Sequence, residues 1–288
     1  MTRIGYREVY ALVLESLGRE ANRGTRLSES GFHTLAEDVV SLALTKRLIE
    51  PPIGGLRVNG RPTSPQAERV RELVRQAMWG LLAKGIIVFG LNETNPNWPW
   101  YSLTDLGKEV VKAPAPQPYD PDGFVAYFKR TCGSADPTVE AYVVEAVHAF
   151  NSGCNRAAAV MLGCASEKLI LLLTDVFEDS ISDASKRASF QRAMARKWAI
   201  SYKYKTLKEH LDLMVDGRKL PPDHAETVGS ELPSGFELLR RSRNAGGHPD
   251  VPGDVDADTI FLNLRTFTEY ARRVGALIDH FKNNQADW

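Results

Sequence analysis

Apolar residues recur at helical spacing in three segments of the first third of the chain, at residues 6–18, 34–48 and 63–85. The third segment opens on Thr63-Ser-Pro-Gln66, which fits a capping box, and it ends at Lys84-Gly85, where a glycine can close a helix. In each segment the apolar positions gather on one helix face. The pattern therefore predicts three amphipathic helices.

The pattern changes to that of a β-hairpin after the third predicted helix. Ile86-Ile-Val-Phe89 and Trp100-Tyr-Ser-Leu103 are short runs of β-branched and aromatic residues, and residues 92–99 between them are rich in Asn and Pro. These runs predict two antiparallel strands joined by a long turn. Thr104 is placed to cap a short last helix over residues 105–111.

A proline-rich segment follows this first region. Residues 112–121 contain four prolines, and proline fixes φ and removes a backbone donor. We therefore expect an extended linker at 114–121, which joins a domain at 1–113 to a second domain at 122–288.

The second region has the apolar pattern of an all-helical bundle. Helices are predicted at 137–151, 154–179, 185–215 (one long helix or two broken ones), 234–245 and 256–283. Asp136-Pro137 suits a helix start, since an Asp caps the first turn and Pro fits its first position. The segment at 154–179 is nearly all apolar, so we expect it to be the buried centre of the bundle. The predicted fold class is mainly α.

Composition narrows the possible classes of protein. A chain of 288 residues that is 43% hydrophobic and 25% charged is not intrinsically disordered over most of its length. Its 36 basic and 36 acidic residues balance, which argues against a protein that coats nucleic acid indiscriminately. We find no apolar run of the ~20 residues that span a bilayer and no signal peptide, so we expect a cytoplasmic protein without a membrane partner. The three cysteines show no metal-ligand spacing, and neither a metal nor a cofactor is expected.

Three helices, a hairpin and a short helix resemble a winged helix-turn-helix domain over residues 1–113. In that family the third helix can enter the major groove of DNA while the hairpin contacts the backbone. The outward face of the third predicted helix carries three candidate nucleic-acid-binding residues, Arg69, Arg71 and Arg75. Glutamates are interleaved with them, so a solvated face with i,i+4 ion pairs is an equally open interpretation.

The segment most suggestive of chemistry is Arg243-Asn244-Ala-Gly-Gly-His248. Within an all-helical domain it resembles the HEPN family, whose hallmark is Arg-x4–6-His with a polar residue directly after the arginine. Arg241 also fits the spacing to His248. Residues 155–169 look like the long second helix of such proteins. We expect Gly246-Gly247 to end the helix before His248, at a C-terminus whose dipole favours protonated imidazole.

The HEPN resemblance implies a metal-independent endoribonuclease that works as a homodimer, with both motifs lining one cleft. His248 would move protons near neutral pH, and Arg243 would grip a phosphate through two parallel hydrogen bonds. Asn244 would orient the histidine or hold a phosphate oxygen. Glu167, a carboxylate on an otherwise apolar helix, is expected either to pair with a buried arginine or to face this cleft. The products would carry a 2′,3′-cyclic phosphate.

A basic strip lies between residues 186 and 208, where eight basic residues and no acidic one occur and aromatic residues such as Trp198 are interleaved. The candidate RNA-binding residues on it are Lys197, Lys203 and Lys205. Basic residues attract polyanions and aromatic rings can stack on unpaired bases, whereas the plainer interpretation is a solvated helix with its aromatics packed inward.

The two family resemblances imply one function, and a second of another class is kept beside it. The first is an RNA-cleaving enzyme of toxin–antitoxin or antiviral defence, with a winged-helix sensor that contacts DNA, RNA or protein and with an antitoxin or defence-system partner. The alternative is a non-enzymatic DNA-binding regulator or defence-complex adaptor that uses the bundle to dimerise. Without a function, Arg243 would be a group that caps the helix end and His248 a surface histidine. A further alternative is a binding module, since HEPN-like domains with an intact fold also act without catalysis.

Overall fold

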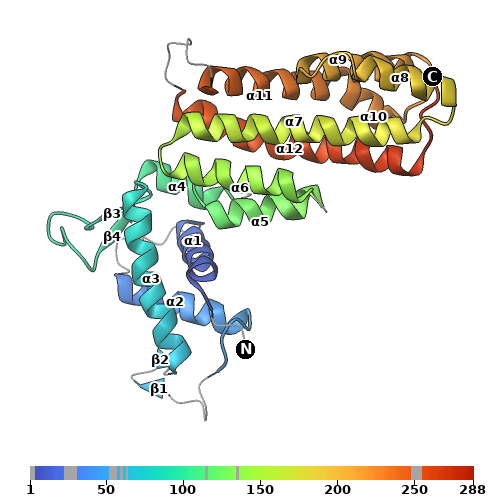
Figure 1. Cartoon of the computed structure of the whole chain (residues 1–288). Helices are drawn as coiled ribbons and strands as arrows, with labels where there is room; N and C mark the ends of the chain where they lie inside the picture. The colour runs from blue at the N-terminus through green and yellow to red at the C-terminus, as the bar shows by residue number, and fades with distance from the viewer. Residues whose placement is uncertain are drawn as a thin grey trace. The chain divides into compact units, whose positions relative to one another are not determined.

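Helices make up most of the chain in the computed structural model, as the sequence pattern predicts. The structure describes residues 4–22, 31–51, 57–58, 61–62, 64–113, 116–133, 136–247 and 255–288. The chain divides into two units, Met1–Phe124 and Val125–Trp288, whose elements are labelled in Figure 1.

The first unit contains the predicted three helices, hairpin and short helix in the predicted order, and also an unpredicted pair of two-residue strands before the third helix. Its elements are α1 (Tyr6–Asn22), α2 (Phe32–Thr45), β1 (Arg57–Val58), β2 (Arg61–Pro62), α3 (Pro65–Ala83), β3 (Ile87–Phe89), β4 (Tyr101–Leu103) and α4 (Asp105–Lys112). Strands β3 and β4 pair antiparallel, with Ile87 opposite Leu103. The helical period buries one face of each of α1, α2 and α3, through residues such as Val13, Val39 and Val74.

The helix starts in this unit follow capping chemistry, with one correction. Ser64 is the N-cap of α3, and its hydroxyl accepts a hydrogen bond from the amide of Ala67 at 3.1 Å. Thr63, the predicted cap, lies outside the described residues, and the Gln66 side chain accepts from the amide of Glu50 instead of closing a capping box. Thr104 caps α4 as predicted, since its hydroxyl accepts from the amide of Gly107 at 2.9 Å.

The predicted linker is not extended through its second half. Gln117 and Asp120 are buried in the first unit, and the backbone oxygen of Tyr119 accepts a hydrogen bond from Lys84 at 3.2 Å. Asp120 also accepts from the amide of Gly123, in the first turn of α5 (Pro121–Cys132), a helix that the proline-rich pattern does not predict. The structure divides between Phe124 and Val125, within α5, because this proline-rich stretch packs on the first unit.

The second unit is a helical bundle. Its further elements are α6 (Pro137–Asn151), α7 (Asn155–Ser180), α8 (Ala184–Met194), α9 (Ile200–Asp216), α10 (Pro222–Glu226), the π-helical segment η3 (Thr227–Glu231), α11 (Leu232–Gly247) and α12 (Ala257–Asn283). Asp136 caps α6 as predicted. The region 185–215 forms two helices, α8 and α9, while α10 and η3 were not predicted.

Helix α7 is the centre of this bundle and packs against α6, α11 and α12 (Figure 1). By length and composition alone it could cross a membrane, which corrects the expectation that no segment of the chain is apolar enough. More than half of its most apolar stretch is buried inside the bundle, through residues such as Leu162, Leu169 and Phe177. The burial explains the apolar sequence by packing, as in the core helix of a soluble protein.

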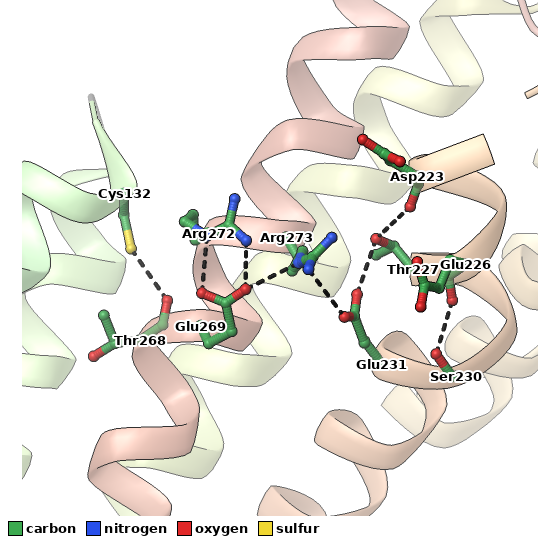
Figure 2. Close-up of polar contacts among 10 residues, drawn as sticks. All are labelled: Cys132, Asp223, Glu226, Thr227, Ser230, Glu231, Thr268, Glu269, Arg272 and Arg273. Atoms are coloured by element: carbon green, nitrogen blue, oxygen red, sulfur yellow. Dashed lines mark hydrogen bonds and ion pairs between the residues drawn. The ribbon is translucent and has the colours of Figure 1, made fainter. Parts of the chain in front are cut away.

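The π-helical segment is joined to α12 by a polar network, shown in Figure 2. The Thr227 hydroxyl lies 2.9 Å from the backbone oxygen of Asp223 and 3.0 Å from Oε2 of Glu231. Glu231 in turn pairs with Arg273 at 3.4 Å, and Arg273 donates a hydrogen bond to Glu269 at 2.9 Å. These bonds hold the segment that leads into α11 against α12.

Candidate functional site

Glycines bring α11 unusually close to α7. A Cβ atom at Gly246 would lie 3.0 Å from the backbone oxygen of Arg156 and 3.1 Å from Cβ of Ala159. A Cβ atom at Gly163 would lie 2.3 Å from Cβ of Arg243. Helix α11 includes both Gly246 and Gly247, so it does not fray ahead of them, because Gly246 serves close packing between helices. The expected helix end before His248 falls at the limit of the described residues and stays a prediction.

This packing fixes Arg243 beside Glu167. The stem of Arg243 lies against Gly163, and its NH1 atom is 3.6 Å from Oε1 of Glu167. The same NH1 atom donates a long hydrogen bond to Oδ1 of Asn244 at 3.4 Å. Arg243 keeps 40% of its side chain exposed, so the guanidinium remains open to solvent. Burial together with the Glu167 carboxylate raises the pKa of the neighbouring Cys164 thiol.

Arg243, Asn244 and Glu167 line one groove of about 540 Å³. Helices α7, α9 and α11 form its walls together with the segment between α8 and α9. Further lining side chains are Trp198, Lys203 and Arg240. The groove therefore holds three cations against one carboxylate. Glu167 was expected either to face this cleft or to pair with a buried arginine. It lines the groove, and it also pairs with Arg243, which is partly exposed.

The basic strip divides into an inner and an outer part. Tyr204 stacks on Phe236 at a centroid distance of 4.1 Å and Phe190 is buried, as the plainer interpretation predicts. Lys203 instead reaches the groove, where its Nζ lies 5.6 Å from the ring centroid of Trp198. Two predicted RNA-binding residues do not line the groove: Lys197 lies over the ring of Tyr202 at 5.4 Å, and Lys205 faces Glu209 at 4.0 Å.

Of the two arginines that fit the spacing to His248, the groove contains Arg243. Arg241 is 76% exposed, donates to Glu237 at 2.8 Å and does not line the groove. His248 itself lies outside the described residues. Helix α11 is described as far as Gly247, so it runs to the residue before this histidine.

No protein-family model, curated protein or solved structure matches the chain. The groove is therefore the main guide to what the protein does. Across the described ranges, no three His, Cys, Asp or Glu side chains are grouped so that they could share a metal ion.

Two of the three arginines predicted on the outward face of α3 are held in ion pairs. Arg71 donates to both carboxylate oxygens of Glu37, at 2.9 and 3.0 Å, and to Glu68 at 2.7 Å. These carboxylates raise the pKa of the Arg71 guanidinium. Arg69 pairs with Glu72 at 3.1 Å. Ion pairs thus account for part of this face, although the two within α3 have i,i+3 spacing and not the expected i,i+4 spacing. Arg75 is exposed on the same face.

Sequence reasoning missed Arg240 and did not assign Trp198 to the site. Arg240 precedes Arg243 by three positions, and that spacing places both on one face of a helix, which is a signal that the sequence carries. Trp198 follows Arg196-Lys197 in a break between two helical stripes. By sequence Trp198 groups with the other aromatic residues of the strip, and this break in the apolar period is the signal that separates it from Phe190 and Tyr204, which pack inward.

Proposed function

We propose that this chain is a metal-independent endoribonuclease of the HEPN type, and that RNA is cut at the groove between α7, α9 and α11. The observation that carries the proposal is that Arg243, Asn244 and Glu167 line one cationic groove with Lys203. The first three come from the motif and the long helix that suggested the family, and the fourth comes from the basic strip. His248 follows α11 directly in the sequence.

The reaction uses the nucleophile that RNA itself contains. A base removes the proton of a ribose 2′-OH, the 2′-oxygen forms a bond to the adjacent phosphorus, and the bond from phosphorus to the 5′-oxygen breaks. The leaving 5′-oxygen takes a proton from an acid. Products are a 2′,3′-cyclic phosphate and a 5′-hydroxyl. His248 serves as the proton carrier, and its copy in a second protomer takes the opposite role in a homodimer.

The groove side chains stabilise charge on the phosphate. In the free protein Arg243 is neutralised in part by Glu167 at 3.6 Å, a distance at which the two are paired without a hydrogen bond. A phosphate offers two oxygens in the geometry that guanidinium binds best, so it displaces this loose contact. Asn244 then holds a phosphate oxygen or the histidine.

The first unit serves this enzyme as a winged-helix sensor or targeting domain. The order of three helices, hairpin and helix supports that interpretation, and its ligand is DNA, RNA or a protein. The proposed setting is the cytoplasm, in toxin–antitoxin or antiviral defence, with an antitoxin or defence protein as partner. The alternative, a non-enzymatic DNA-binding regulator or adaptor, has less support, because Arg69 and Arg71 on α3 are held in ion pairs.

The proposal predicts RNA cleavage without metal. Purified protein incubated with total RNA in EDTA is expected to produce fragments with 2′,3′-cyclic phosphate and 5′-hydroxyl ends, because the 2′-OH replaces a metal-bound water as nucleophile. End-specific ligation and mass spectrometry identify these termini. The matched control is a 2′-O-methylated RNA, which lacks the nucleophile and should stay intact. Fragments with 3′-hydroxyl ends, or cleavage of the methylated RNA, would contradict the mechanism.

A second prediction concerns Glu237, which neutralises a groove cation from outside the groove. Arg240 and Arg241 donate hydrogen bonds to Glu237 and lower the pKa of its carboxyl to about 2. A lowered pKa means that the charged form, and the stability that it contributes, is present above the ordinary pKa and is lost only as the pH falls toward 2. At neutral pH Glu237 is therefore charged and opposes binding of a polyanion at Arg240.

Glu237→Gln is expected to tighten RNA binding about two- to fivefold at low salt, as removal of an exposed charge pair allows. Fluorescence anisotropy with the 2′-O-methylated RNA measures this, and the gain should shrink at high salt. Glu209→Gln is the matched control, since Glu209 faces Lys205 away from the groove lining. An equal gain in both variants would mean that net charge alone matters, and would contradict a specific role for Arg240.

A further inference from the structure

Trp198 is the most exposed large hydrophobic side chain among the described residues. It is 94% exposed, whereas the next, Leu262, is 59% exposed. The other exposed tryptophans of the described chain, Trp79 and Trp98, each contact the ring of Phe89. The indole of Trp198 instead lies beneath a cation, the Nζ of Lys203, at 5.6 Å from the ring centroid. An indole left in water is unfavourable, and such residues commonly mark binding surfaces.

The position of Trp198 shows what kind of surface this is. The residue lies between α8 and α9, and it lines the same groove as Arg243 and Arg240. The groove lining is positive, since Glu167 is the acidic residue set against its three cations. An aromatic plane and a row of cations thus share one groove.

This combination fits a polynucleotide better than an acidic peptide. The carboxylates of an acidic peptide would pair with the cations, but a carboxylate side chain brings no planar ring with it to cover the indole. A nucleotide has a phosphate and a planar base joined through one ribose, so it can contact both at once. In a duplex the faces of the bases are covered by their neighbours, so an indole can stack only on an unpaired base.

We propose that Trp198 is a stacking subsite for one unpaired base of a polynucleotide whose phosphates are bound by Lys203, Arg240 and Arg243. The proposal rests on the proposed function, because it places the stacked base in the groove where that RNA is cut. Lys203 lies 5.6 Å from the indole centroid, so its ammonium group is placed to bind a phosphate next to the stacked base. Trp198 then selects substrates with an unpaired nucleotide at the cut site.

The test measures binding of the uncleavable 2′-O-methylated RNA to the full-length chain, as a single strand and as a duplex with its complement. Trp198→Ala is expected to weaken single-strand binding about 5- to 150-fold, the range that alanine substitution of a base-stacking aromatic produces. Trp198→Phe, which keeps an aromatic face, should restore most of the affinity. Duplex binding should change little, because no base face is available there.

Leu213→Ala is the matched control, since Leu213 is an exposed hydrophobic residue on α9 that does not line the groove. It should bind both RNAs like the parent protein. Unchanged single-strand affinity in Trp198→Ala would overturn the proposal. So would equal losses for single strand and duplex.

A second copy of the chain is the competing occupant of this surface. Sedimentation velocity of the parent protein and Trp198→Ala distinguishes the two. An unchanged sedimentation coefficient supports a base as the occupant. Dissociation of an oligomer in Trp198→Ala would assign the indole to a subunit contact and overturn the stacking subsite.

Failure of the nuclease proposal gives a different result. Suppose that the protein binds single-stranded RNA through Trp198 but cleaves no RNA in EDTA. The stacking subsite is then supported as part of an RNA-binding protein, and the proposed nuclease activity is contradicted.

Discussion

Replacing Arg243 by alanine is expected to lower RNA cleavage in EDTA by about 10²–10³-fold, as loss of a donor that stabilises transition-state charge does. The guanidinium is the groove cation that belongs to the Arg-x4-His motif, and nothing else on α11 occupies its place against Gly163. Arg243→Lys should recover only part of the rate, because an ammonium keeps the charge and loses the two-pronged geometry. Single-turnover cleavage of a labelled RNA gives these rates.

Arg241→Ala is the matched control for this experiment. Arg241 also fits the spacing to His248, but it is exposed and paired with Glu237 away from the groove. Its loss should change the cleavage rate little. His248→Ala should reduce the rate by about 10²–10⁴-fold, the usual contribution of a general acid or base. A large loss in Arg241→Ala together with full activity in Arg243→Ala would reverse the assignment of the motif arginine.

The second large effect is expected from adding one methyl group at Gly163. A Cβ atom there would lie 2.3 Å from Cβ and 2.4 Å from Cγ of Arg243, so α11 must move away from α7. Overpacking of this kind costs about 1–3 kcal/mol. Gly163→Ala should therefore lower the urea midpoint of unfolding. It should also lower RNA cleavage, because the displaced helix carries Arg243 out of the groove.

Gly275→Ala provides the opposite control within the same bundle. Gly275 lies within α12, and beyond its own helix backbone and chain neighbours a Cβ atom there would meet nothing within 4 Å. This substitution should stabilise the protein by about 0.5–1 kcal/mol through helix propensity. Equal stability of Gly163→Ala and Gly275→Ala would show that α7 and α11 are not held as closely as the structure describes.

Most helices of the fold could be predicted from the sequence, because their apolar period and caps are local signals. Asp136-Pro137 begins α6 and Thr104 caps α4, as the residue types indicate. The exceptions depend on distant packing. Proline-rich residues after Lys112 suggested an extended linker, but Lys84 and the core of the first unit bind that segment.

The candidate site was predictable only in part. The carboxylate of Glu167 on an apolar helix predicts either an arginine partner or a place in the cleft, and the structure adds that its partner is Arg243 of the motif. The low helix propensity of glycine predicts a frayed end at Gly246, whereas Gly246 is helical and the close approach of α7 decides its role. The sequence pattern makes Arg71 a candidate DNA contact. Its ion-pair partner Glu37 lies on another helix, so the local sequence does not show that the guanidinium is already engaged.

Contact between Gly163 and the stem of Arg243 has a consequence for how tightly the groove can bind. Side chains of arginine usually lose rotamer freedom when a ligand arrives, and that entropy opposes binding by about 0.5–1.5 kcal/mol. Here the first carbons of Arg243 are confined by α7 as soon as the bundle folds. A phosphate therefore meets an arginine whose stem is already ordered, and that part of the entropic penalty falls on folding instead of on recognition.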